Sequence, residues 1–311
     1  MAVQFAVAFS SILKGAGIIA GGPYYCARGD QITATSVCSC APFGCFGPST
    51  TNVQELIRIT DQNAAQGLID PTSNLRNGRF WLFSGTADTA VPQRIMDDLK
   101  TYLLRYVDND NIFYKNDLPA EHAQPTDFFG NPCDVRDDPF INNCHYDAAG
   151  ALLEWIYGPL QPKSSGRLQG SFVEFSQREF LAASHGLADK GWLFAPANCI
   201  RGEPCRLHVA FHGCKQYQTY DYFSPGAGLV TFGTTYVRNT GYNKWADTND
   251  IIILYPQATT TPTNPLGCWD WWAYDDPDYA TKNGRQLAAV RQMMGRIASG
   301  SALPGAPSGL K

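Results

Sequence analysis

Two residues that could share a proton, Asp88 and His122, each follow a predicted strand. Asp88 comes after the apolar run "FWLFSG", and His122 lies in the loop after "NIFYK". In parallel α/β sheets, ligands bind beyond the carboxyl ends of the strands. An acid beside a histidine at that edge orients the imidazole and supports its charge, as general-base catalysis requires. Asp88 could instead cap the helix predicted after it, because aspartate is a preferred N-cap residue. We favour the pairing with His122.

A third candidate is the turn His-Gly-Cys in "LHVAFHGCKQ", at the end of another apolar strand. A glycine turn after a strand can aim backbone N–H groups into the crevice, as an oxyanion hole requires. The alternative is a tight turn anchored by a disulfide of Cys214, and both can hold. His208 and His212 lie four residues apart and would face one side of a strand. Because no third ligand is near, we expect packed or hydrogen-bonded histidines and no metal.

Strands and helices alternate along the chain, which predicts an α/β fold with a mostly parallel sheet flanked by helices. Apolar spacing, helix-start prolines and terminal glycines mark the elements. The expected strands are 15–20, 80–85, 111–115, 191–197, 206–213 and 251–258, and the expected helices are 2–13, 52–66, 92–106, 146–158, 235–249 and 284–298. We expect a single unit over 1–299 and a flexible Pro/Gly tail over 300–311.

Composition excludes several classes of partner. The formal net charge is −4 and there is no cluster of lysine and arginine, so nucleic acid is not an expected partner. No stretch reaches the roughly 18 continuous apolar residues of a membrane-spanning helix. The motif "GAGIIA" at 15–20 begins like a dinucleotide fingerprint, but a helix-like segment precedes it and "GGPYYC" follows. Without a strand before and a helix after, it predicts no nucleotide cofactor.

The ten cysteines lie in local groups, which indicates disulfides and an oxidising compartment. Zinc is the competing interpretation for the first four, Cys26, Cys38, Cys40 and Cys45, but their spacing lacks paired C-x2-C knuckles. We favour disulfides. The opening segment "MAVQFAVAFSSILKGAGIIAGG" has no basic start, and Lys14 interrupts its apolar run, so we expect no signal peptide in this chain.

Seven blocks of the sequence are distinctive as a series: "AGGPYYCA", "SGTADTAV", "EHAQPTDF", "NNCHYDAAGALLEWIYG", "LHVAFHGCKQ", "NTGYNKWADTNDIIILYPQA" and "GCWDWWAY". In this order they resemble blocks of the secreted poly(3-hydroxybutyrate) depolymerases, which are esterases with a circularly permuted α/β-hydrolase fold. The resemblance implies that Asp88 and His122 are triad members, that Cys214 gives an oxyanion N–H, and that Trp271 lines the substrate crevice. It also places the oxyanion block after the histidine, as the permuted chain order requires. The tryptophans around Trp271 could instead fill the core.

The family's nucleophile is a serine in a Gly-Leu-Ser-x-Gly-Gly elbow before the helix that matches "MAVQFAVAF". No G-x-S-x-G occurs in these 311 residues, and Ser10 and Ser11 lie too far along the helix to substitute. We therefore expect the first strand and the elbow to be missing, through truncation or in an inactive relative. Such a chain would lack most of its esterase rate. The neighbours of the missing strand would be unpaired, which predicts low stability or aggregation.

The resemblance implies three disulfides, Cys133 with Cys144, Cys199 with Cys205, and Cys214 with Cys268, and leaves the first four cysteines to pair among themselves. It implies a secreted, extracellular polyester hydrolase without cofactors, which we expect to be a monomer. Feruloyl or acetyl-xylan esterases use the same kind of catalytic triad and are the nearest alternative function. A non-catalytic protein that binds a polymer and keeps only the crevice is the alternative of a different class.

Overall fold

The computed structural model describes the chain except for residues 42–43, 46–50, 182–185, 225, 302 and 304–311. Its α-helices are α1 (Ala2–Ala8), α2 (Gln31–Ser36), α3 (Val53–Ala65), α4 (Gln93–Leu103), α5 (Ala148–Tyr157), α6 (Ala197–Ile200), α7 (Thr235–Asn239), α8 (Tyr242–Asn249) and α9 (Arg285–Ala298). Its strands are β1 (Gly15–Ile19), β2 (Arg79–Phe83), β3 (Ile112–Lys115), β4 (Gln124–Thr126), β5 (Asn131–Pro132), β6 (Ile141–Asn143), β7 (Ser171–Ser176), β8 (Lys190–Ala195), β9 (Arg206–Val209), β10 (Asp221–Ser224), β11 (Gly228–Thr231) and β12 (Ile251–Tyr255).

The first sheet has the order β1-β2-β3, and both of its pairings are parallel. Side chains alternate along β2: Phe80 and Leu82 pack with α4, whereas Trp81 and Phe83 pack on the other face with α5. A Cβ at Gly17 would lie 1.8 Å from a methyl carbon of Leu152, so α5 approaches β1 closely only because this residue is glycine. Helices therefore cover both faces of β2, and its carboxyl end leads into the loop of Asp88.

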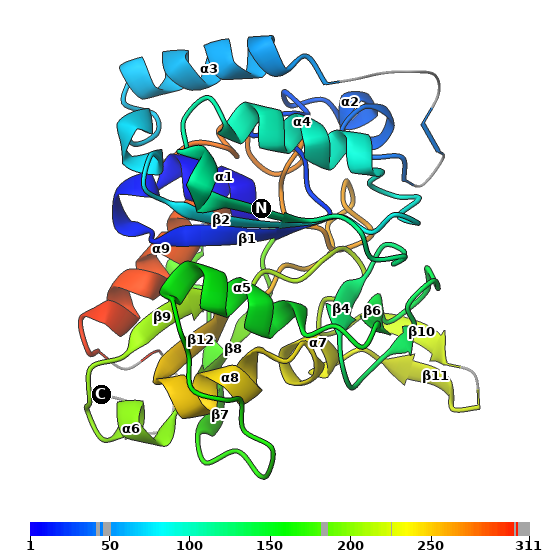
Figure 1. Ribbon diagram of the computed structural model, residues 1–311, viewed down its shortest axis with the longest axis vertical. Coiled ribbons are helices and arrows are strands. Elements are labelled where there is room, and N and C mark those ends of the chain that lie inside the picture. The colour runs from blue at the N-terminus through cyan, green and yellow to red at the C-terminus, as the bar shows by residue number, and fades with distance from the viewer. Residues whose placement is uncertain (42–43, 46–50, 182–185, 225, 302, 304–311) are drawn as a thin grey trace.

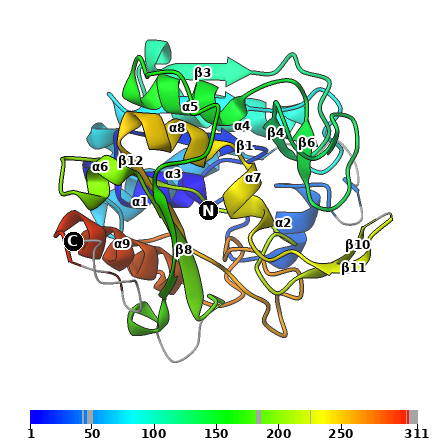
Figure 2. The same ribbon diagram turned by 90° about the horizontal axis from the view of Figure 1, so that it is seen from below.

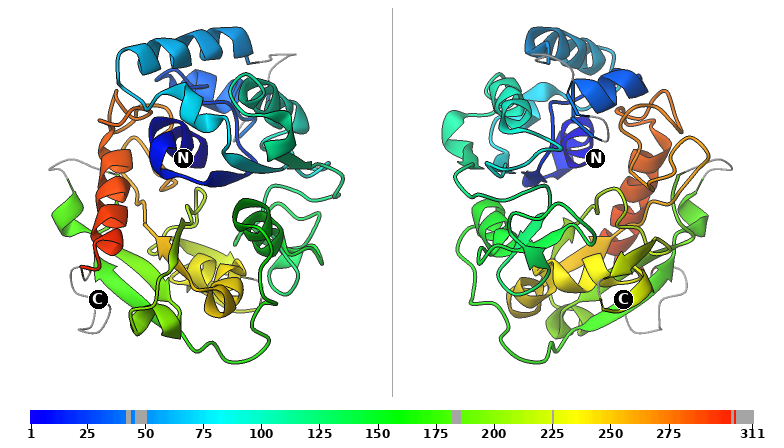
Figure 3. Two further views of the ribbon diagram at one scale, coloured as in Figure 1. Left: turned by 60° about the vertical axis from the view of Figure 1, so that its left-hand side comes forward. Right: turned by 90° about the vertical axis from the view of Figure 1, so that its right-hand side faces the viewer.

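The second sheet has the order β7-β8-β12-β9 and lies in the other half of the molecule (Figures 1 and 3). The pairings β7–β8 and β8–β12 are antiparallel, and β12–β9 is parallel. Strand β7 was not among the expected elements. Within the described residues β1 pairs only with β2, and β9 only with β12. The strands expected in one sheet therefore form two separate sheets. Strand β1 is an edge strand of the first sheet, and β9 is an edge strand of the second.

The α/β class is confirmed, with three corrections to the expected elements. The helix expected over 235–249 is two helices, because Gly241 between them has a φ of 93° in the left-handed region that glycine adopts without a steric cost. The first helix ends at Ala8 and is followed by a 3-10 turn at Ser10–Ile12. Strand β9 ends at Val209, so His212 lies in the following loop and does not share a strand with His208.

All ten cysteines form disulfides, which decides the question of zinc at the first four. The implied pairs Cys133–Cys144, Cys199–Cys205 and Cys214–Cys268 are confirmed, and the first four pair as Cys26–Cys38 and Cys40–Cys45. No helix in the described part of the chain has both the length and the apolar character needed to cross a membrane. Most of the tail expected over 300–311 lies outside the described residues.

Two small sheets complete the fold and lie near the carboxyl end of the first sheet. Strands β4, β6 and β5 follow His122 in the chain. The antiparallel hairpin β10–β11 projects from the body of the molecule, as Figure 2 shows.

Candidate active site

Asp88 is fixed in the loop between β2 and α4. Its side chain is 2% exposed, and its Oδ1 accepts hydrogen bonds from the backbone N–H groups of Ala90 (2.9 Å) and Val91 (2.7 Å). Helix α4 begins only at Gln93, with Pro92 as its N-cap residue. Asp88 therefore closes the turn before the helix and does not cap it. Its second oxygen, Oδ2, is left for another partner.

That partner is His122, whose Nδ1 lies 3.0 Å from Asp88 Oδ2. The two residues follow β2 and β3, which are adjacent and parallel, so the structure brings them together at one sheet edge as the sequence predicts. Beside an ionised carboxylate, Nδ1 carries the proton and Nε2 is an acceptor. The His122 side chain is 33% exposed, and Nε2 has no hydrogen-bond partner among the described residues. The pair has the geometry of a general base with its orienting acid.

Glu121 is a buried acid beside this pair that sequence reasoning missed. Its Oε2 accepts from the backbone N–H of His122 (2.6 Å) and of Thr89 (3.2 Å), and its Oε1 accepts from the Thr89 hydroxyl. The Thr89 hydroxyl also accepts from the Arg136 guanidinium at 3.1 Å. Glu121 thus ties the loop of His122 to the loop of Asp88 at a second point. Its place directly before the histidine was the only signal in the sequence.

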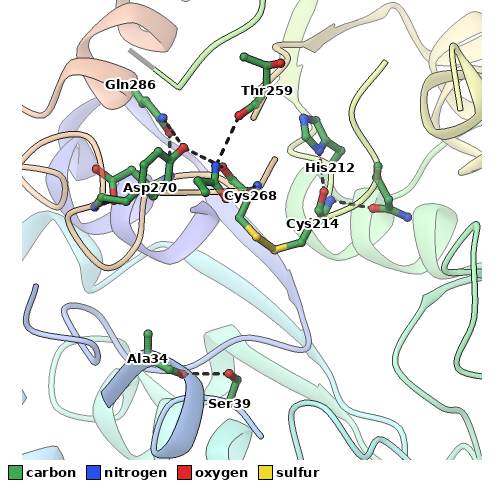
Figure 4. Close-up of a disulfide and its surroundings, with 12 residues drawn as sticks. Ala34, Ser39, His212, Cys214, Thr259, Cys268, Asp270 and Gln286 are labelled. Atoms are coloured by element: carbon green, nitrogen blue, oxygen red, sulfur yellow. Dashed lines mark hydrogen bonds between the residues drawn. A yellow bond between two sulfur atoms is a disulfide. The ribbon is translucent and has the colours of Figure 1, made fainter. Parts of the chain in front are cut away.

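The His-Gly-Cys turn follows β9 and is anchored at several points (Figure 4). Cys214 is bonded to Cys268, and the Lys215 N–H donates to Leu266 O at 2.7 Å. His212 is 3% exposed; its Nδ1 lies 2.7 Å from Gly213 O, and its Nε2 accepts from the Ala258 N–H at 3.0 Å. Burial lowers the pKa of His212 to about 4. The expectation of a hydrogen-bonded histidine is confirmed here.

His208 is also hydrogen-bonded, since its Nδ1 lies 3.4 Å from the Tyr157 hydroxyl. The one group of possible metal ligands within the described residues is Cys199, Cys205 and Asp250, and its two cysteines form a disulfide. A disulfide offers no thiolate to a metal.

Gln216 connects the His-Gly-Cys turn to the loop of His122. Its Oε1 accepts from the Gly213 N–H (2.7 Å), and its Nε2 donates to Pro139 O (3.0 Å) and Phe140 O (3.2 Å). The same Phe140 carbonyl accepts the N–H of Gln124, two residues after His122. A short chain of hydrogen bonds therefore runs from one candidate loop to the other.

Trp271 lies three residues after Cys268, on the loop that the disulfide ties to Cys214. It is partly buried and packs edge-on against Trp272, with ring centroids 5.4 Å apart. Trp269 is 4% exposed and packs on Phe211 and on His212. The core-filling alternative therefore describes Trp269 and Trp272, which are buried, better than Trp271.

Within the described residues, no hydrogen bond joins Ser10 or Ser11 to His122. The Ser11 hydroxyl donates to Asp70 Oδ2, and the Ser10 hydroxyl is buried without a hydrogen-bond partner. Neither serine is in the geometry of a nucleophile beside its base.

No protein-family model matches this chain. It is similar to a poly(3-hydroxybutyrate) depolymerase of Delftia acidovorans, with 45% identity over 305 residues that cover 97% of this chain and 58% of that protein. It is 37% identical to a polyhydroxybutyrate depolymerase of Talaromyces funiculosus over 96% of this chain and 86% of that protein. The chain thus spans less than two thirds of the Delftia protein.

Two solved structures match over 96% of this chain and 92% of theirs, each with a TM-score of 0.84 and 34% identity. One is the PHB depolymerase from Penicillium funiculosum, and the other is a PHB depolymerase with a serine-to-alanine substitution in complex with an R3HB trimer. Identity of 37% over 86% of a relative's length, together with the shared fold, shows that this chain belongs to the poly(3-hydroxybutyrate) depolymerase family.

Proposed function

We propose that this chain carries the base and one oxyanion donor of an esterase that hydrolyses poly(3-hydroxybutyrate) or short 3-hydroxyalkanoate esters. The observation that carries the proposal is the 3.0 Å contact between Asp88 Oδ2 and His122 Nδ1 at the carboxyl ends of two adjacent parallel strands. The relatives named above are depolymerases of this polyester, which supports the choice of substrate.

In the proposed mechanism a serine hydroxyl attacks the ester carbonyl while His122 Nε2 takes its proton. Asp88 holds the imidazole in the required tautomer and stabilises the imidazolium. The Cys214 N–H donates to the oxygen that becomes negatively charged in the tetrahedral intermediate. His122 then gives its proton to the leaving alkoxide, and a water activated by His122 hydrolyses the acyl-enzyme.

The nucleophile is the part of the triad that these residues do not supply. We propose that it belongs to a Gly-Leu-Ser-x-Gly-Gly elbow and that these 311 residues alone do not turn over esters. Two observations support this: the sequence has no G-x-S-x-G, and Ser10 and Ser11 are engaged or buried away from His122. The order of the proposed site residues, with His122 before Cys214, supports a circular permutation of the α/β-hydrolase chain.

We assign contact with the polymer to Trp271. Its partial exposure leaves aromatic surface for the methyl-bearing polyester chain, whereas Trp269 and Trp272 are 4% and 9% exposed. The disulfide Cys214–Cys268 holds the loop of Trp271 beside the proposed oxyanion donor.

We further propose a secreted, extracellular monomer with one catalytic unit over 1–299 and no cofactor, metal or nucleic-acid partner. Five disulfides with no free cysteine among the described residues support an oxidising compartment.

The proposal is tested with a soluble butyrate ester and a serine-reactive fluorophosphonate. This chain should neither turn over the ester nor take the label, and fusion of a Gly-Leu-Ser-x-Gly-Gly segment before Met1 should restore both. Within the fused chain, His122→Ala should abolish turnover. Asp88→Asn should lower kcat by about 10⁴-fold, because the amide would donate to Nδ1 and impose the wrong tautomer. Labelling of a serine within residues 1–311, with turnover, would show that the missing-elbow account is wrong.

A non-catalytic polymer-binding role is the second candidate, and the missing G-x-S-x-G is the observation that favours it. It predicts that the chain adsorbs to polyester granules and that the fused elbow restores neither label nor turnover. A separate comparison tests whether the esterase is a polyester depolymerase or a feruloyl-type esterase. The fused chain is assayed with the polyester and with feruloylated xylan as substrates.

A further inference from the structure

The Cys214 N–H is useful as an oxyanion donor only if its peptide is held in one orientation. The residue before it is Gly213, which is exposed, and glycine has the widest choice of backbone conformations. The Cys214 N–H itself has no acceptor among the described residues, so no intramolecular bond of its own fixes where it points. Something else must hold the Gly213–Cys214 peptide.

His212 holds this peptide through the carbonyl of Gly213. Its Nδ1 lies 2.7 Å from Gly213 O, a contact that needs a proton on Nδ1, because a carbonyl oxygen only accepts. Its Nε2 accepts the Ala258 N–H at 3.0 Å, which needs a nitrogen without a proton. Both bonds form together only in the neutral imidazole with its proton on Nδ1. The rings of Trp269 and Tyr236 pack against the imidazole, with centroid distances of 5.5 and 6.2 Å, and hold it in place.

In a trans peptide the C=O and N–H bonds point in opposite directions. A bond from His212 to Gly213 O therefore turns the Cys214 N–H away from the imidazole. We propose that His212 is a positioning residue that sets the orientation of the oxyanion N–H of Cys214 through the Gly213 carbonyl. This inference rests on the oxyanion role given to Cys214 in the proposed function.

Gln216 holds the other peptide of Gly213. It accepts the Gly213 N–H at 2.7 Å, so both peptides that flank the glycine are held by buried side chains. Its amide nitrogen binds Pro139 O and Phe140 O, and Phe140 O also binds the N–H of Gln124. Gln216 thereby also fixes the position of the turn that His212 orients relative to the loop of His122.

Two substitutions of His212 separate its two hydrogen bonds. In His212→Asn the amide nitrogen stands at the bond position of Nδ1 and can still donate to Gly213 O, but the Ala258 N–H loses its acceptor. In His212→Gln the amide oxygen reaches the position of Nε2 and can accept from Ala258, but Gly213 O loses its donor. Each variant loses one buried hydrogen bond, so a purely structural role affects both alike.

The first measurement follows the Cys214 amide of this chain by ¹⁵N-cysteine NMR, with crystal structures of both variants to show the peptide. We expect the parent orientation in His212→Asn and a rotated peptide with a shifted Cys214 amide signal in His212→Gln. The second measurement is butyrate ester turnover by the chain fused to the elbow. There His212→Gln should lower kcat by about 10²-fold, the size of effect for a lost oxyanion donor, with KM unchanged, while His212→Asn stays near the parent.

An unrotated peptide in His212→Gln, or equal effects of both variants on the amide and on kcat, overturns the inference. The proposed function fails separately, if the fused chain with its native His212 shows no turnover. In that case the Cys214 amide and the crystal structures still decide whether His212 sets the peptide orientation.

Discussion

Replacement of His212 by asparagine should make the protein less sensitive to acid. Burial lowers the pKa of His212 to about 4, whereas an unfolded chain has the ordinary histidine value of 6.5. Below pH 6.5 the unfolded state therefore binds a proton that the folded state does not take up until pH falls to about 4. Folding stability must fall through this window, and asparagine removes the titration.

The size of the effect follows from the two pKa values. The difference between 6.5 and about 4, at about 1.36 kcal/mol per unit, corresponds to about 3 kcal/mol, most of which is lost by pH 4.5. The hydrogen bond from Ala258 adds to the effect of burial, since an imidazolium would direct Nε2–H at the Ala258 N–H. A buried N–H left without an acceptor by itself costs about 1–3 kcal/mol.

Urea unfolding of the parent and of His212→Asn, at pH 7 and at pH 4.5, measures the effect. The substitution costs stability at pH 7, where the Ala258 N–H loses its acceptor. Between pH 7 and pH 4.5, the stability of His212→Asn relative to the parent should then rise by about 2–3 kcal/mol. All other titrating groups are common to the two proteins and cancel in the comparison. If the parent and His212→Asn differed in stability by the same amount at both pH values, the inference that the folded protein keeps the His212 imidazole neutral would be refuted.

Three further outcomes follow from single side chains. Glu121→Ala should destabilise the fold by about 2–4 kcal/mol in urea unfolding, because it strands two backbone N–H groups and the Thr89 hydroxyl, while Glu121→Gln should keep most of the stability. Gly213→Ala places a Cβ 2.9 Å from Gln216 Oε1 and should reduce kcat of the fused chain with little change in Tm. Asp270 has its pKa raised to about 6 by burial, so the folded state binds a proton before the unfolded state and gains stability as pH falls from 6 towards 4. Relative to the parent, Asp270→Asn should therefore lose about 2 kcal/mol between pH 7 and 4.5, the opposite sign to His212→Asn.

The elements with strong local signals could be predicted from the sequence. The helix after Pro92 and the helix that ends at Gly158 are present, as are the strands that lead to Asp88 and His122. Because both strands are parallel neighbours, the strand-end rule was enough to pair an acid with a histidine 34 residues away.

The division into two sheets could not be read from periodicity, because strand partners are chosen by the tertiary fold. Strand β7 has the sequence SFVEFS, in which apolar and polar residues do not strictly alternate, and it pairs antiparallel with β8; the sequence analysis assigned no strand there. The break at Gly241 was also missed, since a glycine within a helical pattern is compatible with a continuous helix.

The supporting residues of the site were harder to predict than its chemical groups. Glu121 and Gln216 act through hydrogen bonds to the backbone of other loops, and such partners leave no spacing pattern in the sequence. His212 was expected to be hydrogen-bonded, but its particular acceptor, the carbonyl of the next residue, appears only in the folded turn.

The disulfide Cys214–Cys268 makes the oxyanion half of the candidate site sensitive to redox conditions. It spans 54 residues, whereas each of the other four bonds spans 12 or fewer. The acid–base half adjoins two shorter disulfides, because the Glu121 N–H donates to Cys133 O at 2.9 Å and the Cys40 N–H donates to Ala90 O at 2.6 Å. Reduction of the long bond alone would release the loop of Trp271 from the proposed oxyanion turn. Protein made in a reducing cytosol would therefore lack the covalent tether between these two loops of its crevice.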